Sequence, residues 1–282
     1  MAMAGARAAR RLDLLYPVTA VGLALVTWHL VVVVFQLRPT LLPTPVRALA
    51  KAYAVRDLLL GHGIVTLLEI LGGFALSVAV GMGSALLMTR WRAFERTATP
   101  ILVFLQTVPH ISIAPLFIVW FGFGIVPKVL VSFLMAYFPV VIATTVGLKA
   151  VEADMLDLIR SMEATAWQVY AKVRIPHALP YFFSGAKIAA AFATSGAIVG
   201  EFVGSDRGLG YLLMVANSTT NSELLFATIF VVSAIGIALF GVILRLERAL
   251  LPWHVATRGE RQGSAGRGAE RGPGRREGGR RS

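Results

Sequence analysis

The ionisable side chains of Glu69, His110 and Glu201 lie inside long apolar runs of this sequence. Ionisable groups in such runs are costly where the run crosses a membrane, and they mark functional sites by default. For each, the sequence leaves two interpretations open. Glu69 and Glu201 can line a pathway for an ion or solute, or can extend to the outer membrane interface. His110 can contact a solute, or can hydrogen-bond to a neighbouring helix.

A stripe of small residues leads up to Glu201. Gly185, Ala189, Ala193 and Ala197 recur at every fourth position, which places them on one face of a helix. Small residues at this spacing allow another helix to approach closely. We therefore predict that the stripe packs at a dimer contact or lines a translocation path.

Few residues are available for other chemistry. The sequence has no cysteine, which excludes disulfides, thiolate catalysis and cysteine-ligated metals. Its five histidines are scattered, and no Ser/His/Asp set can be placed on one face. The motif G-x-x-x-x-G-K-[ST], which holds ATP phosphates, does not occur. We expect no enzymatic activity, cofactor or metal in this chain.

A polar segment at residues 152–187 separates two apolar runs, and it is patterned. Met155, Ile159, Met162 and Ala166 recur at helical spacing, which predicts a short amphipathic helix. Most linkers lack such a pattern.

A second short helix is predicted directly after the first. Thr165 and Gln168 have the form of a capping box, which begins a helix. The residue before a proline is disfavoured in helical conformation, so this helix is expected to end before Pro176. A tight turn near Glu163 and Ala164 is expected between the two helices.

This segment resembles the cytoplasmic EAA loop of permeases from binding-protein-dependent ABC importers. The family pattern is EAA, three residues, Gly, nine residues, then Ile-x-Leu-Pro. Here Asp157-Leu158-Ile159 stands for EAA and Glu163 for the glycine, and Val173-Arg174-Ile175-Pro176 closes the motif at the family spacing. The strings ALPYFFSGAKIA (178–189) and GEFVGSDRGLGYLL (200–213) resemble the nitrate/sulfonate/taurine branch. That branch includes carriers of thiamine-precursor pyrimidines and riboflavin.

The resemblance covers residues 42–253 and implies an all-α type I importer permease that works as a dimer. Its expected partners are a second permease copy, two ABC ATPase subunits that use ATP and Mg²⁺, and an external solute-binding protein. The expected cargo is a small solute such as a sulfonate, nitrate, a thiamine-precursor pyrimidine or riboflavin.

The resemblance also assigns the patterned loop to ATPase coupling. Glu163 occupies the position of the family glycine, which often needs the left-handed backbone conformation. The turn is therefore expected to be strained or built differently, or Glu163 contacts a cation of the ATPase; we favour a strained or rebuilt turn that still docks. Trp167 and Tyr170 are candidate anchors for the ATPase, or they face lipid headgroups; the resemblance favours docking, and less so for Tyr170. Gly208-Leu209-Gly210 is interpreted as a turn that faces the binding protein. The residues predicted for coupling are Asp157, Ile159, Met162, Glu163, Ala164, Thr165, Trp167, Gln168 and Pro176.

Composition places the chain in the membrane. Of its 282 residues, 56% are hydrophobic and 15% are charged, and several apolar runs reach the roughly 20 residues that span a bilayer. We predict a polytopic all-α protein with a basic N-terminus (1–11), a permease domain (12–257) and a disordered basic tail (258–282). The coupling loop is predicted at residues 149–180. Six spans are predicted at residues 12–35, 62–89, 100–121, 128–148, 181–203 and 224–251.

The distribution of cations predicts the orientation. With both termini in the cytoplasm, 21 Lys and Arg residues lie inside and six outside. Cytoplasmic segments carry the excess of such residues in multi-pass membrane proteins. Much of the net charge of +12 lies in the tail, so we expect contact with solvent or lipid headgroups rather than nucleic acid. The expected location is the cell membrane.

Two rival functions remain open at this point. An ion-gradient-driven secondary transporter would use Glu69, His110 or Glu201 as its ion site, but it leaves the patterned loop unexplained. A membrane-embedded enzyme would need a convergent catalytic set, for which the sequence offers no residues.

Overall fold

The computed structural model describes residues 2–252, so the predicted tail at 258–282 lies outside the described residues. The described part is helical, with no strand between residues 2 and 252. Its helices are α1 (Ala2–Val34), α2 (Pro45–Ala54), α3 (Arg56–Arg90), α4 (Arg92–Thr107), α5 (His110–Phe121), α6 (Ile125–Lys149), α7 (Ala153–Ser161), α8 (Ala166–Val169), the π-helical turn η1 (Tyr170–Arg174), α9 (Ile175–Gly204), α10 (Leu209–Ser218) and α11 (Ser222–Leu250).

Helix α9 packs along α6 at the centre of the bundle, and α3 packs against both. Small residues allow the two backbones to approach closely. A methyl group added at Gly196 would lie 2.6 Å from the Cα atom of Ser132, and one added at Gly185 would lie 2.6 Å from the carbonyl oxygen of Pro139. The hydroxyl of Ser132 also donates to the carbonyl oxygen of Ala193 at 2.9 Å. Close packing and a hydrogen bond between helices therefore hold α6 to α9.

Four of the described helices are long and apolar enough to cross a membrane: α3, α6, α9 with the helical turns before it, and α11. Each contains most or all of one predicted span. In α1 the apolar part, Thr19–Val34, is shorter. The chain is therefore a multi-pass membrane protein by the length and composition of its helices.

The interval predicted as the third span, residues 100–121, is divided in the structure. Helix α4 ends at Thr107 and α5 begins at His110, and their axes meet at 99°. Val108 is extended, with ψ 126°, and Pro109 follows it as the N-cap of α5. A proline has no N–H to donate and disfavours helical conformation in the residue before it. The break therefore falls where the sequence places Pro109.

The prediction that the second loop helix ends before Pro176 is wrong. Helix α8 continues through η1 into α9, so helical backbone runs from Ala166 to Gly204. The N–H of Ile175 bonds to the carbonyl oxygen of Tyr170, five residues back, which is the wider π-helical pattern. Pro176 is the second residue of α9 and directly follows this wider turn.

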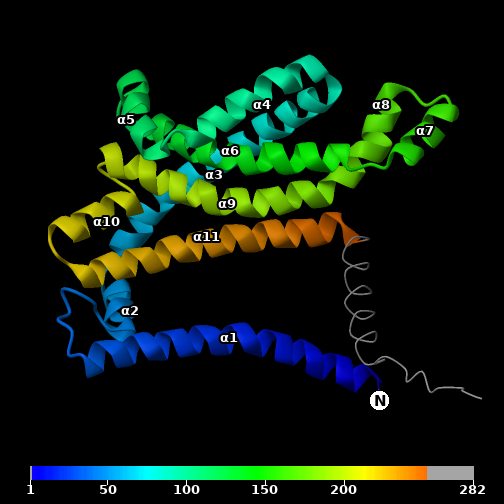
Figure 1. Cartoon of the computed structure of the whole chain (residues 1–282). Helices are drawn as coiled ribbons and strands as arrows, with labels where there is room; N and C mark the ends of the chain where they lie inside the picture. The colour runs from blue at the N-terminus through cyan, green and yellow to red at the C-terminus, as the bar shows by residue number, and fades with distance from the viewer. Residues whose placement is uncertain (1, 253–282) are drawn as a thin grey trace, which may run out of the picture.

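Different helices lie at the two ends of the bundle (Figure 1). Helices α7 and α8 project at one end, which also holds the start of α1 and the end of α11. Helices α2 and α10 lie at the opposite end. The predicted coupling loop and both ends of the described chain are thus on one side of the bundle.

Candidate functional site

The predicted coupling loop folds as two short helices joined by a tight turn. The hydroxyl of Thr165 accepts from the N–H of Gln168 at 3.3 Å, and the Gln168 side chain accepts from the N–H of Thr165 at 2.8 Å. This reciprocal pair is a complete capping box, as predicted from the sequence. It begins α8 and fixes the direction in which that helix leaves the turn.

Glu163 has a left-handed backbone, with φ 59°. This conformation is the one expected at the position of the family glycine, so the shape of the turn is retained although the residue has changed. A side chain in the left-handed region costs roughly 1–2 kcal/mol relative to glycine. Of the alternatives left open by the sequence, the structure shows a strained turn that keeps the left-handed conformation.

Apolar side chains project from this turn into open space. Met162 is 74% exposed and Trp167 is 75% exposed, and on α7 Leu158 is 63% and Met155 50% exposed. Asp157 and Gln168 are exposed among them, whereas Ile159 and Ala164 are half-buried. Large apolar and aromatic side chains grouped on a projecting element are typical of a protein contact surface. We call Met155, Leu158, Met162 and Trp167 the exposed turn surface.

Tyr170 does not belong to this surface. It is half-buried, and its ring lies under the guanidinium of Arg174, 5.0 Å from the ring centroid. The Arg174 side chain also donates to the Tyr170 hydroxyl at 3.4 Å. Tyr170 is thus engaged within its own helix, which leaves Trp167 as the exposed aromatic of the pair.

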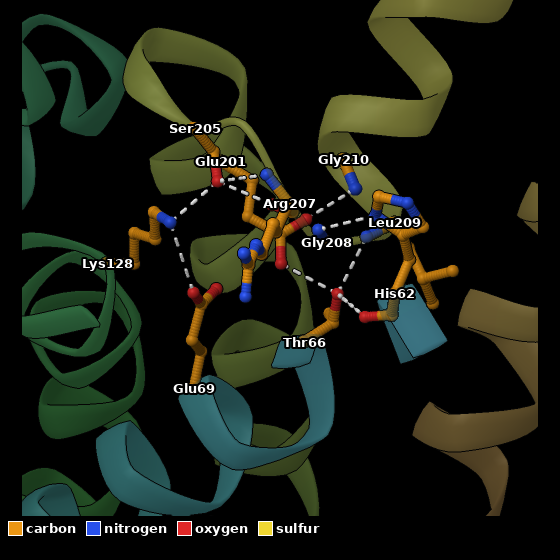
Figure 2. A network of polar contacts seen from close by, with 10 residues as sticks. All are labelled: His62, Thr66, Glu69, Lys128, Glu201, Ser205, Arg207, Gly208, Leu209 and Gly210. Atoms are coloured by element: carbon orange, nitrogen blue, oxygen red, sulfur yellow. Dashed lines mark hydrogen bonds and ion pairs between the residues drawn. The ribbon is translucent and has the colours of Figure 1, made fainter. Parts of the chain in front are cut away.

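A buried polar network occupies the opposite end of the bundle (Figure 2). Glu69 of α3 and Glu201 of α9 are both 0% exposed, so neither extends to the membrane interface. Lys128 at the start of α6 is 6% exposed, and its Nζ lies 3.4 Å from Glu69 Oε1. The hydroxyl of Thr66 donates to Glu201 Oε1 at 2.6 Å. Side chains from three helices thus meet in one water-excluded cluster.

The backbone at the start of α10 donates hydrogen bonds to this cluster (Figure 2). The N–H of Gly208 donates to His62 Nδ1 at 2.9 Å, and the N–H of Leu209 donates to the Thr66 hydroxyl at 2.8 Å. The N–H of Gly210 donates to Glu201 Oε2. Glu201 therefore places its carboxylate at the N-terminus of α10, where free N–H groups and the helix dipole favour an anion.

The glycines of Gly208-Leu209-Gly210 make this approach possible. Gly208 has φ 106°, a region that side chains rarely adopt, and a methyl group there would collide with the Glu201 carboxylate. A methyl group at Gly210 would lie 2.8 Å from Glu201 Cβ. These two glycines are therefore explained by contact with Glu201, inside the protein.

The sequence matches the family described as "Binding-protein-dependent transport system inner membrane component" over residues 75–252. This chain belongs to that family. It is 38% identical over 230 residues to a probable ABC transporter permease protein of Haemophilus influenzae, an alignment that covers 82% of this chain and 94% of that one. It is also 38% identical to the formylaminopyrimidine transport permease protein ThiX of Halalkalibacterium halodurans, covering 77% and 87% of the two chains. The relatives confirm the nitrate/sulfonate/taurine branch of ABC permeases, whose members are non-catalytic membrane components.

The fold agrees with this assignment. A chain of the MetNI methionine ABC transporter, in an inward-facing conformation, superposes with a TM-score of 0.61 at 19% identity and covers 70% of this chain and 97% of that one. The permease fold of type I importers is thereby confirmed.

Two predicted groups of path residues differ in how far they are buried within the chain. His110 begins α5 at the break and is half-buried, beside Gln106 and Tyr137. By contrast, Gly185, Ala189, Ala193 and Ala197 are buried within the chain, mainly against α6. The burial of this stripe therefore needs no second copy.

Sequence reasoning missed His62, Thr66 and Lys128 as members of the buried network. His62, Thr66 and Glu69 are spaced four and three residues apart, which places them on one face of α3. A polar face on an otherwise apolar helix is a signal that was present in the sequence. Lys128 carried no such signal, because it follows a loop at the start of its span.

Proposed function

We propose that this permease forms the translocation path of an ATP-driven importer and couples to separate ATPase subunits through the exposed turn surface. The observation that carries the proposal is that four large apolar side chains project from α7, α8 and the capped, left-handed turn between them, at one end of the bundle. Such a surface is costly to leave in water and fits a groove in a partner. The chain has no phosphate-binding loop, so a partner must hydrolyse ATP and use the Mg²⁺ that accompanies it.

The proposed assembly has two permease copies, two ATPase subunits and an external solute-binding protein. The family description supports the binding protein, since it names transport that depends on one. The ATPase closes on nucleotide and draws the two α7–α8 turns together, which shifts the permease between inward-open and outward-open packings.

The proposed cargo is a small anionic or heterocyclic solute. Relatives are named for transport of formylaminopyrimidine, riboflavin, aliphatic sulfonates and taurine. We place the path beside the break between α4 and α5, where Gln106 and Thr107 are exposed and His110 is half-buried. Irregular backbone at membrane depth is tolerated where it lines a cavity or is covered by protein. Glu69 and Glu201 are assigned to packing, because neither has exposed surface.

The proposed orientation places α7, α8 and both termini in the cytoplasm. A cysteine-free chain allows a direct test, in which single cysteines replace the exposed residues Ser161 and Asp206. In intact cells a membrane-impermeant thiol reagent should label the cysteine at 206 and not the one at 161. Labelling at 161 before permeabilisation would reverse the orientation.

Docking is tested by co-purification with the ATPase subunit. Trp167→Ala should weaken recovery of the ATPase, because it removes the most exposed aromatic of the turn. Tyr170→Phe is the matched control, since the Tyr170 ring packs inside its own helix. If the wild-type and Trp167→Ala permeases recover equal amounts of the ATPase, the turn is excluded as the docking surface.

A further inference from the structure

The buried network has an unbalanced set of charges. It contains two carboxylates, Glu69 and Glu201, and one ammonium group, that of Lys128, and none of the three is more than 6% exposed. Lys128 of α6 lies 3.4 Å from Glu69, and Glu201 of α9 is the second carboxylate of the cluster. With both carboxylates ionised, the cluster would hold one negative charge that no buried cation balances. An uncompensated buried charge is strongly unfavourable.

The two carboxylates are not equivalent. Glu201 accepts from the Thr66 hydroxyl and from the N–H of Gly210, so its negative charge is well solvated by fixed donors. Neither oxygen of Glu69 accepts a hydrogen bond from a fixed donor. Lys128 Nζ lies 3.4 Å from Glu69 but donates to the Ser205 hydroxyl at 2.6 Å. If one of the two carboxylates carries a proton, the geometry points to Glu69.

We propose that Glu69 is held as a neutral carboxylic acid whose proton is shared with the Glu201 carboxylate, and that this proton keeps residues 205–210 fastened to the bundle. Glu201 accepts from Thr66, which lies three residues before Glu69 on the same face of α3, so the two carboxyl groups are neighbours (Figure 2). Two ionised carboxylates have no hydrogen to donate. A single proton converts this repulsive contact into a charge-assisted hydrogen bond. It also leaves one anion and one cation in the cluster, which is then neutral.

The shared proton has a consequence for the outer segment. Loss of the proton would put two anions beside Lys128 and draw its ammonium group away from Ser205. Repulsion from Glu69 would also displace the Glu201 carboxylate from the N-terminus of α10. The segment at 205–210 would then lose two hydrogen bonds, from Lys128 to Ser205 and from Gly210 to Glu201. His62 and Arg207 also lie near this segment, but His62 faces Gly208 and Arg207 is exposed.

Glutamine at position 69 is a close mimic of the neutral acid. Its amide can donate to Glu201 and its carbonyl oxygen can accept from Lys128, as the protonated side chain does. Glutamine at position 201 removes the anion that α10 and Thr66 bind. Glu69→Gln and Glu201→Gln are therefore a matched pair with opposite expected effects.

The first measurement is infrared difference spectroscopy of the purified full-length chain at neutral pH. Subtracting the Glu69→Gln spectrum from that of wild type should leave the C=O band of a protonated carboxylic acid. In the same samples, hydrogen–deuterium exchange reports the amides of Leu209 and Gly210. Their exchange should change by less than about twofold in Glu69→Gln and rise by about tenfold in Glu201→Gln, because a hydrogen bond to a charged acceptor is lost. Absence of the acid band would overturn the proposal, as would exchange in Glu69→Gln as fast as in Glu201→Gln.

A titration of wild type keeps the proposal testable if Glu201→Gln does not fold. Alkaline buffer should abolish the acid band and accelerate exchange at 209–210 together, after correction for the intrinsic pH dependence of exchange. The Glu69→Gln chain, which has no proton to lose at this position, should show no such acceleration. Equal alkaline acceleration in both chains would contradict a role for the Glu69 proton.

Discussion

The hydroxyl of Thr66 donates to Oε1 of Glu201 at 2.6 Å, although the two residues are 135 positions apart in the sequence. The same hydroxyl accepts from the N–H of Leu209 at 2.8 Å. One side chain of α3 thereby connects the end of α9 to the start of α10. No other described hydroxyl in the buried network bridges a carboxylate and a loop amide.

Thr66→Val should therefore destabilise the permease. The substitution keeps the shape of the side chain but leaves a buried N–H and a buried carboxylate oxygen without this partner. The expected loss is about 1–3 kcal/mol. Thermal unfolding in detergent measures it, and Thr228→Val is the control because the Thr228 hydroxyl, also buried, bonds within its own helix to Leu224. Equal shifts for the two variants would show that the bridge contributes nothing specific.

Glu163→Gly should stabilise the turn between α7 and α8. Glycine adopts φ 59° without strain, so the local gain is about 1 kcal/mol after the greater flexibility of glycine in the unfolded chain is subtracted. Slower hydrogen exchange at residues 161–165 and preserved or increased coupled ATPase activity are expected. Glu163→Ala separates charge from conformation, because it removes the carboxylate and keeps the strained backbone. Loss of coupling in Glu163→Gly while the complex still assembles would instead make Glu163 a contact residue.

Ala193→Leu should disrupt the contact between α6 and α9. Ala193 is 0% exposed, and the larger side chain would overpack the contact at a cost of about 1–3 kcal/mol. Ala191→Leu, two residues away on the exposed face, is the matched control. The yield of monodisperse protein and its unfolding temperature in detergent report the difference. A stable Ala193→Leu chain would contradict the packing described for this helix face.

A second buried ion pair joins α9 to α11. Lys187 Nζ lies 2.8 Å from Glu247 Oε2, and the two side chains are 15% and 7% exposed. Glu247→Gln leaves the lysine charge without its partner and should cost about 3–5 kcal/mol. The pair formed by Lys149 and Glu95 is more exposed, at 44% and 33%, so Glu95→Gln should cost at most about 1 kcal/mol. Unfolding temperatures in detergent compare the two, and similar shifts would refute the distinction.

The coupling turn was predictable because its signals are local. Thr165 and Gln168 are three residues apart and specify the start of a helix wherever it is packed. The left-handed conformation of Glu163 was one of the alternatives that its place at the motif glycine suggested. The continuation of the helix through Pro176 was not predictable in the same way, because no local residue spacing marks the π-helical turn before it.

The buried network, by contrast, could not be predicted from the sequence. Sequence reasoning selected Glu69 and Glu201 separately and left each a pathway or interface role. The sequence does not specify that α3, α6 and α9 bring these carboxylates and Lys128 together. Such contacts arise from tertiary packing and have no local period or spacing to reveal them.

The most direct test of the account is uptake into proteoliposomes that contain this permease and its ATPase, with the binding protein and solute outside and ATP inside. Riboflavin, formylaminopyrimidine, taurine and aliphatic sulfonates, the solutes named for its relatives, form the panel. We predict uptake that requires ATP hydrolysis and falls in Trp167→Ala. Uptake driven by an imposed ion gradient without ATP would contradict the account and support a secondary transporter.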